Sequence, residues 1–393
     1  MQSNDIIDVL ESEEAATFID THFNDDFAAL SLRFAGKTGF NITVCLQLME
    51  LYKKAKLKIP FYVSKKLGLD KRSYEQSTSQ NVAVYKQGFI NGDTLLDMTA
   101  GLGVDSMFLA KVFNNVKAIE RNEELHKLAV YNLDKVGIGN VLRICGDSEN
   151  ELNRKFDWVY IDPDRRMDEK RLVALPDLEP NVLDLLPKLE DYASRVYVKL
   201  SPLFDVQEVW RKFENCESIH LIAEKGEVKE VGVVLNHTGD LLQQKLVLKD
   251  VLTFFYKEMS RDDVAESLQA SDKEFGNLLI PDSLVSKAKC CEYLLRDKEV
   301  GKHESFELYF GNDDHNEGFR TFNIIEKSNL STKAITSNLK KYNVTQTNIV
   351  IKGLKDKPAI WHKKLNTRDG GNYYLIILKA AHSEAFLVKK ITS

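Results

Sequence analysis

The sequence predicts an α/β fold built on an open, mainly parallel sheet of seven strands, with a helical domain before it and α+β modules after it. Three observations lead to this prediction. Strand and helix patterns alternate from about Thr94 to Asn236, which is typical of a parallel sheet covered by helices. Residues 1–88 repeat apolar side chains mostly at helical spacing. From Phe319 onward, a strand–helix–strand pattern coincides with a change in net charge.

The N-terminal residues are predicted to form a small helical bundle. DIIDVLESEEAATFIDTHF and NITVCLQLMELYKKAKLKI both show helical periodicity, and Pro60 ends the second run. The chain has 393 residues, enough for roughly two or three domains. We predict a helical domain at 1–88, the sheet domain at 89–240, an intermediate segment at 241–318 and a basic α+β module at 319–393.

The predicted strands of the sheet domain are TLLDM, VKAIE, VLRIC, FDWVYID, RVYVKL, IHLIAE and VKEVGVVLN. EKGEVKEV holds a short glycine turn, so the last two strands are predicted to form an antiparallel hairpin at the sheet edge. The stretch LLQQKLVLKDVLTFFYKEM after Asn236 is compatible with a further hairpin or with a helix.

A predicted ligand site lies where the first three strands end. In DMTAGLG, from Asp97 to Gly103, an acid ends the first strand and glycines allow the backbone to approach a ligand. A dinucleotide fingerprint would need glycine at Thr99 and glycine or alanine at Ser106, so NAD is disfavoured. Glu120 and Asp147 end the next two strands, where a carboxylate can accept the ribose hydroxyls and the adenine amino group, respectively.

The fourth strand ends in YIDPDRR, Tyr160 to Arg166. Catalytic groups of such sheets lie at the carboxyl ends of the strands, which makes Asp162 a candidate catalytic residue. Pro163 rigidifies the turn and leaves the carboxylate free to accept a hydrogen bond from an amine. The alternative is that Asp162 only stabilises a proline-containing turn.

Charge and composition limit the partners. The net charge is -5, but residues 319–393 hold 14 Lys or Arg and 4 Asp or Glu, so this tail carries +10 and the rest carries -15. A polyanion held at the C-terminal end is predicted, with a merely solubilising surface as the alternative. The N-terminus lacks an apolar signal region and no apolar run approaches roughly 20 residues, so we expect a cytoplasmic protein without membrane contact. The five cysteines form no CxxC pair, and no metal site is predicted.

These residues resemble a known family. DMTAGLGVDSMFLA with AIERN resembles the nucleotide loop of bacterial 16S rRNA guanine-N2 methyltransferases, and IDPDRR resembles the D-P-P-[YFW] motif of amino-group methyltransferases. The whole chain resembles class I S-adenosylmethionine (SAM) methyltransferases with a THUMP-like C-terminal domain, most closely in Leu95 to Arg166 and in VKLSP, Val198 to Pro202. The resemblance implies a Rossmann-like methyltransferase sheet, a ferredoxin-like module within 241–318 and a THUMP-like module at 319–393.

The resemblance also implies roles for individual residues. Asp97, Gly101 and Gly103 would contact the methionine end of SAM, Glu120 the ribose, Asp147 the adenine and Asp162 the target amine. The full set of expected cofactor contacts is Asp97, Thr99, Gly101, Gly103, Asp105, Glu120, Arg121, Asp147 and Asp162, and the expected catalytic residues are Asp162, Pro163 and Arg165. Asp164 and Arg165 replace the second proline and the aromatic residue of the amino-group motif, so Arg165 is expected to stack on a base or to hold a phosphate.

The predicted function is SAM-dependent methylation of RNA, either tRNA or rRNA, at a base amino group. Two alternatives stay open at this stage. One is a methyltransferase for a small molecule or a protein, and the other is an RNA-binding protein that holds SAM without turnover. The sequence does not indicate an oligomeric state.

Overall fold

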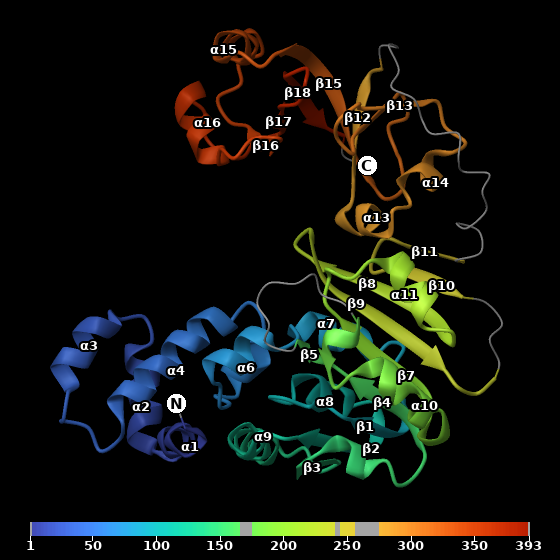
Figure 1. Cartoon of the computed structure of the whole chain (residues 1–393). Helices are drawn as coiled ribbons and strands as arrows, with labels where there is room; N and C mark the ends of the chain where they lie inside the picture. Colours follow the sequence, from blue (N-terminus) through green and yellow to red (C-terminus); the bar gives the residue numbers. More distant parts are fainter. Residues whose placement is uncertain (1, 166–174, 240–243, 256–274, 392–393) are drawn as a thin grey trace. The chain divides into compact units, whose positions relative to one another are not determined.

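The computed structural model describes residues 2–165, 175–239, 244–255 and 275–391 (Figure 1). The chain divides into two compact units. Unit 1 comprises Met1–Ile219 and Glu230–Leu242, and unit 2 comprises His220–Lys229 and Gln243–Ser393. The domain boundaries at residues 88, 240 and 318 stay predictions.

Seven helices precede the first strand, as the periodicity predicts: α1 (Ser3–Glu11), α2 (Glu13–His22), α3 (Phe27–Phe34), α4 (Ile42–Ala55), α5 (Pro60–Ser64), α6 (Lys71–Gln76) and α7 (Gln80–Lys86). Several begin at a residue whose side chain accepts a hydrogen bond from a backbone N–H of the first turn, among them Asn41 before α4 and Asp70 before α6. The buried face of α4, with Leu48 and Tyr52, belongs to the same apolar core as Met107 and Leu128 of the sheet domain. The helical segment is therefore packed onto the sheet domain.

The main sheet has the order β11-β10-β8-β9-β7-β4-β1-β2-β3. Its strands are β1 (Gly92–Asp97), β2 (Phe113–Glu120), β3 (Val141–Cys145), β4 (Phe156–Ile161), β7 (Ala193–Leu200), β8 (Cys216–Glu224), β9 (Glu227–Asn236), β10 (Lys245–Leu248) and β11 (Leu252–Phe255). Within this order the neighbouring strands β7, β4, β1, β2 and β3 are all parallel to one another. β9 runs antiparallel to β7. All seven predicted strands are present.

The predicted number of strands is wrong, because this sheet has nine. Residues 245–255 form the antiparallel hairpin β10–β11, and β10 pairs with the otherwise open edge of β8, whose backbone groups need partners. β8 and β9 are neighbours joined by a tight turn in which Lys225 and Gly226 both have positive φ. This hairpin is not at the sheet edge as predicted, since β9 inserts between β7 and β8.

The connections between the strands supply the covering helices. They are α8 (Val104–Leu109), α9 (Glu123–Val136), η1 (Ser148–Glu151), η2 (Leu175–Asp177), α10 (Val182–Tyr192) and α11 (Val206–Lys212), with a small second sheet of β5 (Asp164–Arg165) and β6 (Leu178–Glu179). Because β1, β2, β3 and β4 are parallel, their carboxyl ends meet at one edge of the sheet (Figure 1).

Unit 2 contains a seven-stranded sheet of order β13-β14-β12-β15-β18-β17-β16. Its strands are β12 (Asn277–Pro281), β13 (Val300–Lys302), β14 (Tyr309–Gly311), β15 (Phe319–Asn329), β16 (Asn348–Lys352), β17 (Tyr373–Leu378) and β18 (Glu384–Lys390), and its helices are α13 (Ser283–Ala288), α14 (Cys291–Leu295), α15 (Thr332–Lys341) and α16 (Pro358–Leu365). Ile377 belongs to the core that includes Leu339 of α15 and Trp361 of α16, whereas its neighbour Ile376 belongs to a second core. The sheet therefore buries both faces.

One pairing in unit 2 crosses a predicted boundary. β12 runs antiparallel to β15 from Asn277 to Pro281, so the segments predicted as 241–318 and 319–393 contribute to the same sheet. None of the described helices is long and apolar enough to cross a membrane.

Candidate cofactor and acceptor site

A cavity of about 920 Å³ opens at the carboxyl ends of β1, β2, β3 and β4 in unit 1. Its lining includes every residue predicted to contact the cofactor, namely Asp97, Thr99, Gly101, Gly103, Asp105, Glu120, Arg121, Asp147 and Asp162. Pro163 is half-buried and does not line the cavity. Arg165 contributes its backbone to β5, and its side chain lies outside the described residues, as does Arg166. The residues that the sequence predicted as cofactor contacts therefore all line one cavity.

The loop after β1 is held by the Asp97 carboxylate. The Thr99 backbone N–H donates to Asp97 Oδ1 at 3.1 Å, and the Ser106 hydroxyl donates to Oδ2. Asp97 is only 1% exposed, and this burial raises its pKa to about 7 against the lowering effect of both hydrogen bonds. Gly101 and Gly103 have φ values of +52° and +87°, a region that other residues rarely adopt, so both glycines are needed for the shape of the loop.

Glu120 connects the loop to the end of β2. Its Oε2 accepts from the Gly101 N–H and its Oε1 from the Asn122 N–H, both at 2.8 Å. Each carboxylate oxygen has two lone pairs, so each can accept one more hydrogen bond from a ligand in the cavity. Asp147 is exposed, and its Oδ1 accepts from the Glu149 N–H at 3.0 Å. Both acids can therefore bind donors without losing their present partners.

Arg121 lines the cavity and pairs there with an acid of β6. Its Nη1 lies 2.5 Å from Glu179 Oε1 of β6, and this carboxylate raises the pKa of the guanidinium. Lys188 of α10 pairs with Glu149 at 2.6 Å. These two ion pairs join the segment that contains β6 and α10 to the ends of β2 and β3, so their first role is to hold the wall of the cavity.

Asp162 lies between the loop and a lysine. Its backbone N–H donates to Thr99 Oγ1 at 2.6 Å, and its carboxylate pairs with Lys199 Nζ at the end of β7. Burial raises the pKa of Asp162, while the Lys199 ammonium opposes that rise. Burial would lower the pKa of Lys199, but the carboxylates of Asp162, Asp105 and Glu230 outweigh it and raise that pKa above its usual value. The carboxyl group of Asp162 and the side-chain amine of Lys199 thus form a pair at the predicted acceptor position.

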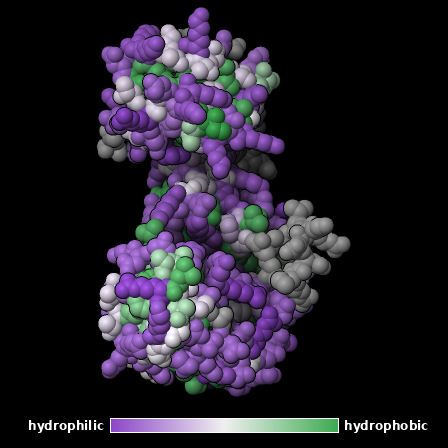
Figure 2. Space-filling view, turned by 90° about the vertical axis from the view of Figure 1, so that its left-hand side faces the viewer, coloured by the Kyte–Doolittle hydropathy of each residue, from purple (hydrophilic) through white to green (hydrophobic). Residues whose placement is uncertain are grey.

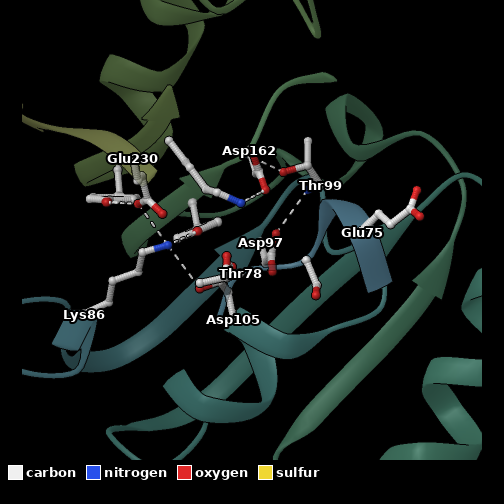
Figure 3. Close-up of polar contacts among 12 residues, drawn as sticks. Glu75, Thr78, Lys86, Asp97, Thr99, Asp105, Asp162 and Glu230 are labelled. Atoms are coloured by element: carbon white, nitrogen blue, oxygen red, sulfur yellow. Dashed lines mark hydrogen bonds and ion pairs between the residues drawn. The ribbon is translucent and has the colours of Figure 1, made fainter. Parts of the chain in front are cut away.

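A fully buried lysine contacts residues that line the cavity (Figure 3). Lys86 of α7 has 0% exposure, and its Nζ lies 3.1 Å from Asp105 Oδ1, 3.0 Å from Glu230 Oε1 and 2.7 Å from the Tyr160 hydroxyl. Thr78 donates to the other oxygen of Asp105 at 2.5 Å. Burial would raise the pKa of Asp105, but Lys86 and Lys199 lower it. Both carboxylate oxygens of Asp105 therefore have protein partners, which indicates that Asp105 mainly anchors α7 to the loop.

Sequence reasoning missed the residues that support the predicted ones. Lys86 has no charged neighbour in the sequence to mark it, and Glu230 comes from the strand β9, far along the chain. Lys199 lies in VKLSP, which the resemblance singled out without a role. Arg143 of β3 is 9% exposed and donates from Nη2 to the Gly101 carbonyl at 2.9 Å, beneath the glycine loop. Only Lys199 carried a signal that could have identified it.

The N-terminal helices form part of the cavity wall. Arg72, Ser73 and Gln76 of α6 line it, together with Ser77 and Thr78 of the following loop. The helical segment therefore contributes to the site directly.

Comparison with known proteins agrees with this architecture. Residues 319–390 match the family described as THUMP domain-like, which confirms the predicted resemblance of the C-terminal segment. The chain is 32% identical over 84 residues to the tRNA (uracil(54)-C(5))-methyltransferase of Pyrococcus abyssi (strain GE5 / Orsay), a match that spans 21% of this chain and 20% of that protein. A solved structure of a candidate methyltransferase from Porphyromonas gingivalis W83 matches over 100% of both chains, with a TM-score of 0.77 and 22% identity. The whole chain therefore has the fold of that protein, while it spans about one fifth of the curated relative.

Proposed function

We propose that this protein is a SAM-dependent methyltransferase that acts on RNA at a base amino group. The observation that carries the proposal is the convergence of a glycine loop with the strand-end acids Asp97, Glu120, Asp147 and Asp162 on one cavity. A cavity of about 920 Å³ lies within the usual range of roughly 300–1,000 Å³ for small-molecule sites.

The residues present fit an adenosine-containing cofactor. Glu120 keeps lone pairs for two ribose hydroxyls, and the exposed Asp147 carboxylate can accept from an exocyclic amine. Asp97 would bind the ammonium of the methionine end through the lone pairs that its hydrogen bonds to Thr99 and Ser106 leave free. Bound SAM supplies a methyl group on a positively charged sulfur, which is attacked by a nucleophile in line with the leaving sulfur.

The chain itself supplies position and charge. Asp162 would accept a hydrogen bond from the amine, and its backbone bond to Thr99 ties this acceptor to the cofactor loop. Lys199 would orient the carboxylate by pairing with it, and its charge opposes the rise that burial causes in the pKa of Asp162. Most of the acceleration would come from holding two reactants in line, since well-oriented reactions reach effective molarities of roughly 10⁵–10⁸ M.

RNA is favoured as the substrate by the C-terminal segment. Residues 319–393 carry +10 and include the THUMP-like match. The Pyrococcus abyssi relative is named as acting on tRNA, which supports the same substrate class here. A cytoplasmic location is part of the same proposal.

A second candidate function has its own observation. Of the residues that line the cavity, eleven are Asp or Glu and three are Lys or Arg, which favours a cationic amine on a small molecule or protein as the acceptor. A third possibility is that RNA and SAM are bound without turnover, and the incubation with labelled SAM described below tests it as well.

Two measurements test the proposal. Glu120→Ala should weaken SAM binding by about 1.5–3 kcal/mol, the cost of losing hydrogen bonds to a charged group, as measured by calorimetry. Glu214→Ala, which removes an exposed acid of unit 1 outside the cavity lining, serves as the matched control and should leave the affinity unchanged. Equal affinities in all three proteins would refute the cofactor site.

The substrate is tested by incubating the protein with labelled SAM and bulk tRNA, bulk rRNA, a protein lysate or a small-amine mixture. Label in RNA is expected. Label only in the protein or amine fraction would establish the second candidate, and SAM and RNA binding without label in any fraction would establish the third.

A further inference from the structure

A second basic region lies in the N-terminal helices. Between residues 53 and 72 the chain has eight Lys or Arg and one acid, Asp70, a local charge of +7 in a protein whose net charge is -5. The cations are Lys53, Lys54, Lys56, Lys58, Lys65, Lys66, Lys71 and Arg72. They extend from the last turn of α4 to the first turn of α6. The tail is therefore not the only basic part of the chain.

Some of these cations already have protein partners. Lys54 pairs with Glu50 and Lys66 with Asp20, both at 2.7 Å, and Lys58 donates to the Tyr74 and Glu75 carbonyls. Lys71 and Arg72 are exposed, and neither has an ion pair among the residues that the structure describes. These two are available to bind an external anion.

The stability of α6 does not explain Lys71 and Arg72. They are the first two residues of the helix, where the N-terminal end of the macrodipole disfavours cations. The Asp70 side chain caps the helix by accepting from the Arg72 and Ser73 N–H groups at 3.0 and 3.1 Å. This cap needs only the backbone at these positions, so the two charges are unfavourable locally and point to a functional reason.

The ion pair of Lys54 and Glu50 at the end of α4 lies near this turn. Lys54 lowers the pKa of Glu50 through a hydrogen bond and its charge, and Lys71 contributes to the same effect, so the end of α4 and the start of α6 lie together (Figure 1). The acids near these cations are Asp20, Glu50, Asp70 and Glu75. The space-filling view shows the side of unit 1 that carries the N-terminal helices as mostly hydrophilic, as expected of a solvent-facing surface (Figure 2).

Arg72 has a particular place because it lines the cavity. Two of the three cavity cations, Arg121 and Lys188, are paired with the cavity carboxylates Glu179 and Glu149. Arg72 is the third and has no such pair in the described part of the chain. With eleven carboxylates in the lining, the interior repels a phosphate, whereas the edge at Arg72 attracts one.

We propose that the first turn of α6 is the phosphate-binding edge of the cavity, with Arg72 holding the phosphate of the target nucleotide of an RNA and Lys71 a neighbouring phosphate. This inference rests on the proposed function and gives the N-terminal helices a role in it. The base enters the acidic cavity while its phosphate stays on the basic edge, as required when an enzyme takes a base out of its stack. The guanidinium of Arg72 can grip two phosphate oxygens at once.

The test compares two variants, each of which replaces two cations that are adjacent in the sequence. Lys71→Gln/Arg72→Gln removes the proposed edge, and Arg211→Gln/Lys212→Gln removes two exposed cations from the last turn of α11, which is also in unit 1 but outside the cavity lining. Binding to unfractionated tRNA and rRNA is measured between about 50 and 200 mM salt. The magnitude of the slope of log affinity against log salt should fall by roughly 0.7–0.9 for each phosphate that is no longer bound, thus by about 1.4–1.8 in the first variant.

Further results are expected from the controls. The salt slope should be unchanged in the Arg211/Lys212 variant, SAM affinity should stay within about twofold in both variants, and Lys71→Gln alone, which keeps Arg72, should show about half the reduction in slope. Equal slopes in the wild type and the Lys71/Arg72 variant would overturn the inference and leave the proposed function intact. A loss of SAM affinity in that variant would also overturn it, because Arg72 would then serve the cofactor. Wild-type protein that does not bind RNA would overturn this inference together with the RNA part of the proposed function.

Discussion

Replacing the buried Lys86 by methionine should destabilise unit 1 by about 3–5 kcal/mol, the usual cost of leaving a buried charge without its partner. Lys86 is fully buried, with two carboxylate oxygens at 3.0 and 3.1 Å. At an effective dielectric constant of about 20, two unit charges 4 Å apart attract by about 4 kcal/mol, so each carboxylate loses an interaction of this order. Glu230 is left with the Tyr197 hydroxyl as a neutral donor, and Asp105 is left with the Thr78 hydroxyl.

The measurement is urea denaturation followed by tryptophan fluorescence in a Trp361→Phe background. The chain has three tryptophans, and the two that remain, Trp158 and Trp210, belong to unit 1. Adding Glu230→Gln to Lys86→Met should restore at least about half of the lost stability, because glutamine carries no charge and still accepts from Tyr197.

The loss should also depend on pH. Burial raises the pKa of Asp105 and Lys86 opposes that rise, so removing Lys86 should shift the folded-state pKa of Asp105 upward. The protonated form of Asp105 then stabilises the fold at low pH, and this contribution disappears as the pH rises. The difference between variant and wild type should therefore shrink from pH 8 toward pH 5. A Lys86→Met protein within about 1 kcal/mol of the wild type at pH 8 would refute the assignment of a structural ion network.

Three further predictions concern the cavity and its surroundings. Asp97 has a folded-state pKa of about 7, above its unfolded value, so its contribution to stability is complete below about pH 4 and is lost as the pH rises through 7. Asp97→Asn should remove this loss. The free energy of unfolding of both proteins is measured by denaturation at pH 5 and pH 8, and the variant should be more stable relative to the wild type at pH 8 than at pH 5. An equal difference in stability at the two pH values would show that Asp97 does not titrate in this range. Asp162→Asn should keep SAM affinity within a few-fold while single-turnover methyl transfer falls by roughly a hundredfold or more. Lys199→Met should move the pH profile of methyl transfer to higher pH, because it removes the cation that opposes the rise in the pKa of Asp162. Lys199→Arg should restore the profile. An unchanged profile in Lys199→Met would exclude this positioning role of Lys199.

The sequence predicted the parts of the site that depend on local order along the chain. Asp97, Glu120, Asp147 and Asp162 each lie at or just after the end of a strand, and parallel strands necessarily bring their carboxyl ends to one edge. Arg121 also follows a strand, but its pairing with Glu179 depends on β6, which is 58 residues away.

The residues that were missed share one property, which is that tertiary packing gives them their role. Lys86 lies on the buried face of α7 with Val82 and Ala83, where an apolar residue is expected, and its partner Glu230 comes from a strand inserted between two others. The nine-stranded sheet was missed for a similar reason, because pairing of β10 with β8 depends on an open strand edge that no local pattern reveals.

The position of β18 determines when the sheet of unit 2 can form during synthesis. This strand follows all the other described strands along the chain, yet it lies between β15 and β17 in the sheet of unit 2. The last residue of unit 1, Leu242, is made 142 residues before β18 begins at Glu384, which at about 5–20 residues per second gives unit 1 roughly 7–28 s to fold first. The edges of β15 and β17 instead wait unpaired until β18 has been made, so a stop codon before Glu384 would remove a central strand and leave two edges open to aggregation.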